Sequence, residues 1–144
     1  MNKILIVDDE EDIHLILKKH FEGIEGIEVI NAYSGEEGVA IYKNLFEKRE
    51  KPSLVIMDLN LSGEENVEDL DRHIEGKDKK MDGVRATREI LKIDPSAVIW
   101  GYTAWFGTEW AKRLKETGAK RVIERILPFK KFVEMVKDFL SNKT

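Results

Sequence analysis

Carboxylate side chains follow two of the apolar runs in this sequence. Asp8 and Asp9 come directly after the run 3–7 (KILIV), and Asp58 lies near the end of the run 54–59 (LVIMDL). If these runs are neighbouring parallel strands, the carboxylates meet at one edge of the sheet, where ligands bind in open α/β folds. Carboxylates packed together repel one another and raise their own pKa values unless a cation binds between them. Because oxygen ligands of this kind suit Mg²⁺, the pattern predicts a magnesium site.

Each of these residues also has an ordinary structural interpretation. An acidic pair such as Asp8-Asp9 favours the positive end of a helix dipole. A threonine after a strand, here Thr103, is commonly a capping or turn residue, and Asp58 taken by itself is equally ambiguous. What favours a site is that polar residues recur at the ends of the first, third, fourth and fifth predicted strands, in the last case near Arg125.

Short apolar runs alternate with amphipathic stretches five times along the chain. We expect strands at 3–7, 28–31, 54–59, 97–102 and 121–126. We expect helices at 11–21, 34–46, 81–93, 108–117 and 128–140. Apolar residues recur every three or four positions in the helices, whereas the strand runs are largely apolar, as in strands buried on both faces. Five βα units with right-handed crossovers predict the α/β class, with a doubly wound five-stranded parallel sheet in the common order 2-1-3-4-5.

Local signals mark several of the expected helix ends. Ser34 followed by Glu37 three residues later is a capping box that opens the second helix. Gly23 is expected to close the first helix in the left-handed conformation, and Gly118 to end the fourth. Pro128 suits the first turn of the last helix, because its fixed φ is already helical there.

The composition indicates a soluble protein of one domain spanning residues 1–144. Hydrophobic residues make up 42% and charged residues 36% of the 144 positions. No apolar run reaches the roughly 18 residues that a membrane span needs, and we expect no signal peptide and a cytoplasmic location. The absence of cysteine excludes disulfides, thiolate metal sites and cysteine nucleophiles. A net charge of −4 argues against nucleic acid as a partner.

A family resemblance adds to this interpretation. The segments KILIVDDEEDI, LVIMDLNL, MDGVRATREI, YTAW and GAK…LPF follow in order the landmarks of response-regulator receiver domains, from about residue 3 to residue 140. The chain therefore resembles a single-domain receiver with the flavodoxin-like fold of the small chemotaxis regulators. The resemblance implies that a histidine kinase passes a phosphoryl group to Asp58, and that the domain signals to an output protein, here unknown, through a conformational change.

The resemblance also implies roles for the other residues of the site. Asp9 would bind Mg²⁺ directly, Asp8 would help through water, and the backbone carbonyl of Asn60 would join Asp58 among the ligands. Thr103 would donate a hydrogen bond to a phosphoryl oxygen. Phosphoryl transfer of this kind depends on in-line positioning and on neutralising charge, so these groups suffice in principle.

Two features depart from the family pattern. Family members place the Met81-Asp82-Gly83 element a few residues after the phosphoacceptor, whereas here the acidic stretch 61–80 intervenes, with seven carboxylates in twenty residues. The family also has a lysine directly before the proline that follows the last strand, and that lysine contacts the phosphoryl group. In this chain Leu127 precedes Pro128, and alignment from Gly118 without gaps places Arg125 at the lysine position. Arginine keeps the cation but is not equivalent to lysine.

Two rival functions remain open. A receiver-like interaction module that no longer takes phosphate would explain the missing lysine. A small Mg²⁺-dependent phosphatase would act on external phosphate esters, but such enzymes typically carry Asp-x-Asp after the first strand, unlike Asp8-Asp9-Glu10. We therefore expect a phosphoacceptor switch rather than an enzyme. The three histidines, His14, His20 and His73, lack metal-ligand spacing and are expected on the surface or on helix faces.

Overall fold

The structure, a computed structural model, describes residues 2–58, 82–103, 109–124 and 128–141. Its strands are β1 (Asn2–Val7), β2 (Ile27–Ala32), β3 (Leu54–Met57), β4 (Ile99–Thr103) and β5 (Arg121–Glu124). Its helices are α1 (Glu11–Phe21), α2 (Gly35–Glu47), α4 (Gly83–Ile93), α5 (Glu109–Thr117) and α6 (Phe129–Ser141).

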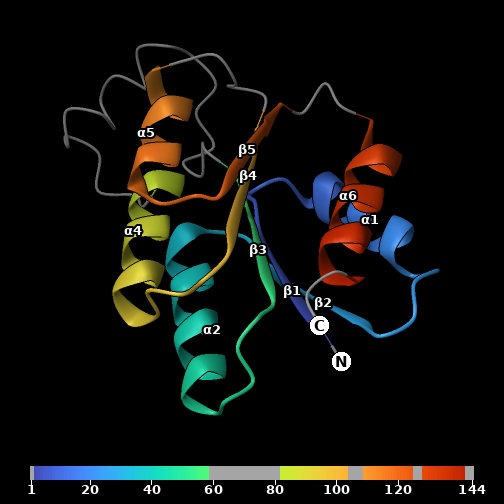
Figure 1. Cartoon of the computed structure of the whole chain (residues 1–144), viewed down its shortest axis with the longest axis horizontal. Helices are drawn as coiled ribbons and strands as arrows, with labels where there is room; N and C mark the ends of the chain where they lie inside the picture. The colour runs from blue at the N-terminus through green and yellow to red at the C-terminus, as the bar shows by residue number, and fades with distance from the viewer. Residues whose placement is uncertain (1, 59–81, 104–108, 125–127, 142–144) are drawn as a thin grey trace.

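The strands that the structure describes are all parallel and form one sheet in the order β2-β1-β3-β4-β5. Helices α1 and α6 cover one face of this sheet, and α2, α4 and α5 cover the other (Figure 1). The predicted doubly wound α/β fold and its strand order are therefore confirmed.

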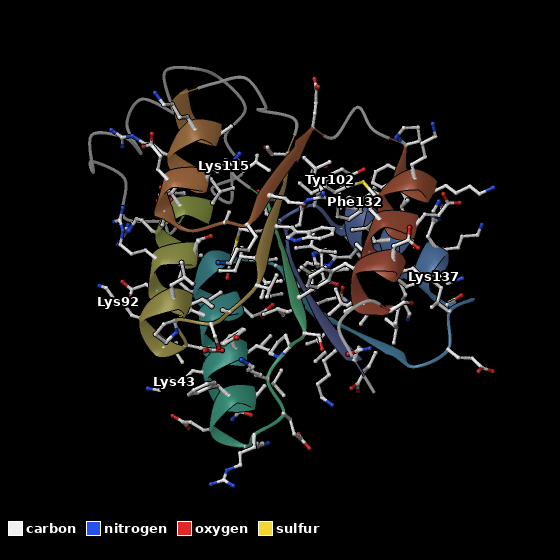
Figure 2. All side chains as sticks on the ribbon, viewed as in Figure 1. Lys43, Lys92, Tyr102, Lys115, Phe132 and Lys137 are labelled. Atoms are coloured by element: carbon white, nitrogen blue, oxygen red, sulfur yellow. The ribbon has the colours of Figure 1, made fainter. Side chains whose placement is uncertain are left out.

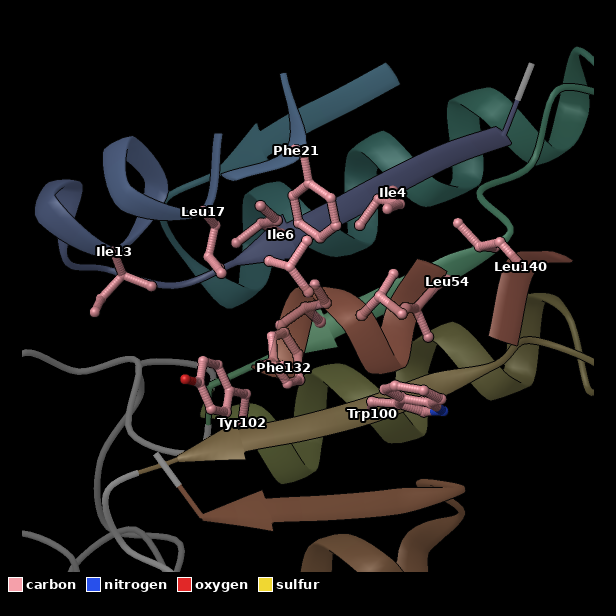
Figure 3. Packing of buried hydrophobic residues seen from close by; sticks show 13 residues of the cluster. Ile4, Ile6, Ile13, Leu17, Phe21, Leu54, Trp100, Tyr102, Phe132 and Leu140 are labelled. Carbon is pink, nitrogen blue, oxygen red and sulfur yellow. The ribbon is translucent and has the colours of Figure 1, made fainter. Parts of the chain in front are cut away.

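The strands divide the apolar core into two layers because successive side chains of a strand point to opposite faces. Ile4 and Ile6 of β1 pack with α1 and α6, whereas Leu5 and Val7 pack with α2 and α4. Figure 3 shows the first layer. Within it, Tyr102 of β4 and Phe132 of α6 stack, with ring centroids 3.9 Å apart and planes inclined by 2°.

Charged side chains occupy the outer faces of the helices. In Figure 2, Lys43, Lys92 and Lys137 project outward from their helices, whereas Tyr102 and Phe132 lie in the interior between β4 and α6. The helices therefore shield the apolar strands from water on both faces of the sheet and present their polar side chains to the solvent. Among the described residues, no helix is both long enough and apolar enough to cross a membrane.

Two of the predicted helix ends can be compared directly. The cap at Ser34 is confirmed: the Glu37 N–H donates to Ser34 Oγ at 3.1 Å. The reciprocal bond reaches one residue further than in a standard capping box, because Glu37 Oε1 accepts from the Tyr33 N–H at 2.7 Å. The prediction for Gly23 is wrong, because the left-handed glycine after α1 is Gly26, with φ of 81°. Helix α1 ends at Phe21, followed by a residue that keeps the helical conformation, so the chain reverses later than predicted.

The ends of the remaining elements agree with prediction to within a few residues. Gly118 follows α5 with φ of 135°, as expected of the residue that ends that helix. Strand β4 starts at Ile99 and includes Thr103, two residues later at its start than predicted. The acidic stretch 61–80 and residue 108, where the fourth helix was expected to start, lie outside the described residues.

Candidate functional site

The pairing of β1 with β3 brings two aspartates to one edge of the sheet. Val7 and Met57 are register partners, and Asp8 and Asp58 are the next residues of their chains. The Asp58 N–H donates to the carbonyl of Val7 at 2.9 Å. On the other side of β1, the Asp8 N–H donates to the carbonyl of Ala32 at 3.1 Å. Both aspartate backbones are thus fixed by the sheet itself.

Asp8, Asp9 and Asp58 form an acidic cluster. Each offers a carboxylate oxygen, and these oxygens all lie within 4.8 Å of one another. Asp8 and Asp58 are buried, with 2% and 5% of their surface exposed, while Asp9 is partly exposed. Three carboxylates this close repel one another in a poorly hydrated setting. The distances confirm the predicted convergence of the carboxylates. Their all-oxygen donor set suits a hard cation and not a soft one.

The turn between β1 and α1 shapes this cluster. The Glu10 N–H donates to Asp8 Oδ1 at 2.8 Å, and the Ile13 N–H donates to the carbonyl of Glu10 at 3.2 Å. Glu10 precedes α1 without a side-chain cap of its own. The Asp8 carboxylate therefore orders the turn through one oxygen and belongs to the acidic cluster as well.

Thr103 ends the strand next to Asp58. Met57 of β3 pairs with Gly101 of β4, so Thr103 lies two residues beyond that pair at the same edge of the sheet. Its side chain is buried, with none of its surface exposed. The predicted order of polar residues at the ends of β1, β3 and β4 is thus present. Asn60 and Arg125, the other predicted site residues, lie outside the described residues.

His14 is a residue of this site to which the sequence interpretation gave no role. It was expected on the surface or on a helix face; it lies on α1, where it is buried, with only 2% of it exposed. Its Nε2 lies 2.7 Å from the backbone oxygen of Asp8, and its Nδ1 lies 2.7 Å from Asn31 Oδ1. Helical spacing could have indicated this burial, because position 14 falls three before Leu17 on the apolar stripe of α1. His20 is exposed, as predicted.

Comparison with known proteins agrees with this geometry. The family described as the response regulator receiver domain matches residues 4–137. This chain belongs to that family. Its place among two-component signalling proteins follows from the same match.

Three relatives illustrate the range of proteins that share this receiver domain. A protein-glutamate methylesterase/protein-glutamine glutaminase of Syntrophus aciditrophicus is 31% identical over 128 residues, which are 87% of this chain and 30% of that protein. The chain thus spans less than a third of that relative. A CheY-like receiver domain protein from Methanospirillum hungatei has a TM-score of 0.75 at 24% identity, with 99% of this chain and 95% of that one covered.

The third comparison is with a chain in the crystal structure of the CheX–CheY–BeF3–Mg²⁺ complex from Borrelia burgdorferi. This chain superposes on that one with a TM-score of 0.73 at 25% identity, with 96% of this chain and 89% of that one covered. Receiver folds of this type are therefore closely similar to the present one over nearly its whole length.

The receiver domain has a second polar cluster at the opposite edge of the sheet, around Asp94. Asp94 Oδ2 accepts from the Tyr42 hydroxyl at 2.7 Å and from Lys51 Nζ at 3.0 Å, and Oδ1 accepts from the N–H and hydroxyl of Ser96. Burial raises the pKa of Asp94, but these hydrogen bonds outweigh it and lower the pKa from 3.8 to about 2. Burial, and then the bond to Asp94 and its charge, raise the pKa of Tyr42, which stays a donor. Asp94 is thus held ionised by surrounding donors.

Proposed function

We propose that this receiver domain accepts a phosphoryl group on Asp58 in a Mg²⁺-dependent reaction, with a histidine kinase as the donor. The observation that carries the proposal is the approach of carboxylate oxygens from Asp8, Asp9 and Asp58 to within 4.8 Å. Three carboxylates are a costly arrangement for a purely structural role, because their negative charges repel one another. A hard cation relieves that repulsion and leaves one carboxylate able to react.

The chemistry of the step follows from the residues at the strand ends. A carboxylate oxygen of Asp58 attacks the phosphorus atom of a phosphohistidine in line with the nitrogen that leaves. The P–O bond forms as the P–N bond breaks, and the electron pair returns to the imidazole nitrogen of the kinase. When bound, Mg²⁺ supplies charge neutralisation on the phosphoryl oxygens. Asp8 and Asp9 would hold the cation, and the Thr103 hydroxyl would donate to an oxygen of the product.

Two further roles come from the family resemblance. The backbone carbonyl of Asn60 would complete the protein ligands of the cation. The guanidinium of Arg125 would take the place of the usual lysine and compensate the remaining charge of the aspartyl phosphate, since arginine pairs well with phosphate oxygens.

The output of the domain is proposed to be a conformational change that a partner protein detects in the cytoplasm, rather than turnover of an external substrate. A buried hydroxyl at the end of β4 and a buried acceptor at the end of β3 lie on adjacent strands. A phosphoryl group on Asp58 adds charge to which the Thr103 hydroxyl can donate, and a movement of Thr103 toward it is the proposed response. Such a local shift at a strand end is the kind of event that changes a binding surface.

Phosphorylation by a small donor tests the proposal directly. Acetyl phosphate with Mg²⁺ should add one phosphoryl group to the intact mass, and Asp58→Asn should abolish the addition. Asp82→Asn is the matched control, because Asp82 is also buried and its helix-capping role, accepting from the Arg85 N–H, suits asparagine equally well. Chelation of Mg²⁺ should stop the labelling of the wild type.

The main rival is an interaction module that does not take phosphate. It would leave the wild type unlabelled and unable to bind BeF3 in the presence of Mg²⁺. Labelling that persists in Asp58→Asn would place the phosphoryl group elsewhere and overturn the assignment.

A further inference from the structure

We propose that His14 is a positioning residue for the acidic cluster, and that it sets Mg²⁺ affinity by fixing the peptide that joins Asp8 to Asp9. The inference rests on the proposed function, because it concerns the same cation. It assigns a role to a histidine that acts on the backbone of the cluster rather than as a ligand.

The contact involves the backbone of the cluster rather than a side chain. His14 Nε2 lies 2.7 Å from the carbonyl oxygen of Asp8. That carbonyl and the N–H of Asp9 belong to one planar peptide unit. A hydrogen bond that fixes the carbonyl direction therefore fixes the plane from which the Asp9 backbone departs. The two aspartates are oriented together by one imidazole.

The ring of His14 is itself held in place. A carbonyl oxygen can only accept, so Nε2 carries the proton in this contact. Nδ1 contacts the side-chain amide of Asn31 at 2.7 Å, and the amide can turn its oxygen or its nitrogen toward the ring. The ring of Tyr33 lies beside it, with centroids 4.2 Å apart. Asn31 belongs to β2 and pairs in register with Ile6 of β1. Helix α1, strand β2 and the end of β1 are thus linked through one side chain.

Two other contacts of Asp8 involve different atoms of the residue. The Asp8 N–H is bound to β2 through Ala32, and its Oδ1 accepts from the Glu10 N–H. Neither of those contacts fixes the carbonyl side of the residue. Removing a group that orients a metal ligand by hydrogen bonding to it commonly weakens metal affinity by about tenfold or more. Loss of the His14 donor should therefore weaken Mg²⁺ binding without removing any ligand.

Mg²⁺ titration by calorimetry on the full chain tests the proposal. His14→Phe keeps a flat ring but has no donor, and its dissociation constant for Mg²⁺ should rise about tenfold. His14→Gln places an amide N–H near the position of Nε2 and should restore binding close to the wild-type value. His20→Phe, an exposed histidine of the same helix, is the control and should bind as the wild type does.

A second variant covers the case in which His14→Phe does not fold. Asn31→Ala leaves the contact to Asp8 but frees the ring, and it should give a smaller loss of affinity than His14→Phe is expected to give. Wild-type affinity in His14→Phe or, if that variant is unfolded, in Asn31→Ala overturns the positioning role. Equal losses in the Phe and Gln variants overturn the hydrogen bond as its cause. A wild type that binds no Mg²⁺ overturns the proposed function itself, which is a separate result.

Discussion

Replacing Asp94 with asparagine should remove a pH-dependent part of the stability of this receiver domain. The carboxylate accepts hydrogen bonds from Tyr42, Lys51 and Ser96 and is almost fully buried, with 3% of the residue exposed. It links α2 and the segment before β3 to the start of β4. The cluster lies at the opposite edge of the sheet from the acidic cluster, so the effect on stability can be measured separately from phosphorylation.

The magnitude follows from the lowered pKa. Burial raises the pKa of Asp94, but the hydrogen bonds overcome this and lower it from 3.8 to about 2. At about 1.4 kcal/mol for each pKa unit, the ionised carboxylate contributes roughly 2 kcal/mol to the free energy of unfolding. The folded-state pKa lies below the unfolded one, so this contribution is complete above about pH 4. It is lost as the pH falls from about 4 to about 2.

Urea unfolding at several pH values, from about pH 7 to about pH 3, measures this contribution. The difference in unfolding free energy between the wild type and Asp94→Asn should be largest at neutral pH and should shrink below about pH 4. Asp138→Asn, an exposed aspartate on α6, is the control and should follow the wild type. A difference that stays constant across the whole range would refute the lowered pKa as its cause.

Three other substitutions probe the fold and the site. Gly118→Ala should lower the unfolding free energy by more than about 1 kcal/mol, because φ is 135° and a Cβ would lie 2.4 Å from Leu91 Cδ1, whereas Gly23→Ala meets nothing within 4 Å; urea unfolding of both variants checks this. Thr87→Val should raise the free energy of unfolding by roughly 1 kcal/mol, because the buried hydroxyl has no hydrogen-bond partner in the described part of the chain. An unchanged melting temperature would show that burying this hydroxyl costs no stability. Arg125→Ala should keep some labelling by acetyl phosphate but lose much of the spectral change that phosphorylation induces, as NMR can follow.

The fold and the acidic cluster were predictable for the same physical reason. Apolar runs of four to six residues alternating with amphipathic helices leave a parallel sheet as the way to bury both. In such a sheet all the strands end at one edge, so residues that follow strands come together whatever their distance in sequence. The proximity of Asp8 and Asp58 could therefore be predicted from their positions after strands alone. Whether Arg125 joins them stays a prediction.

Contacts between distant segments were not predictable in this way. Tyr42 and Asp94 are 52 residues apart and lie on α2 and after α4, where no periodicity relates them. The turn after α1 was missed for a more local reason. Gly23 and Gly26 are equally able to adopt positive φ, and the choice between them depends on how the chain reaches the start of β2. The backbone bond from the Ile24 N–H to the carbonyl of Phe21 shows that the first of these glycines still lies within a helix-like turn.

The buried aspartates of this chain show why burial alone does not identify a site. Asp58 and Asp94 are both nearly inaccessible, with 5% and 3% of their surfaces exposed, and each follows an element rich in apolar residues. Asp94 has two hydroxyls, an ammonium group and a backbone N–H as donors, so its charge is balanced by the fold. Asp58 lies close to two further carboxylates, with oxygens of all three within 4.8 Å of one another. Grouped carboxylates offer the all-oxygen ligand set that a hard cation requires, and in a receiver domain this grouping separates the proposed phosphoacceptor from the structural Asp94.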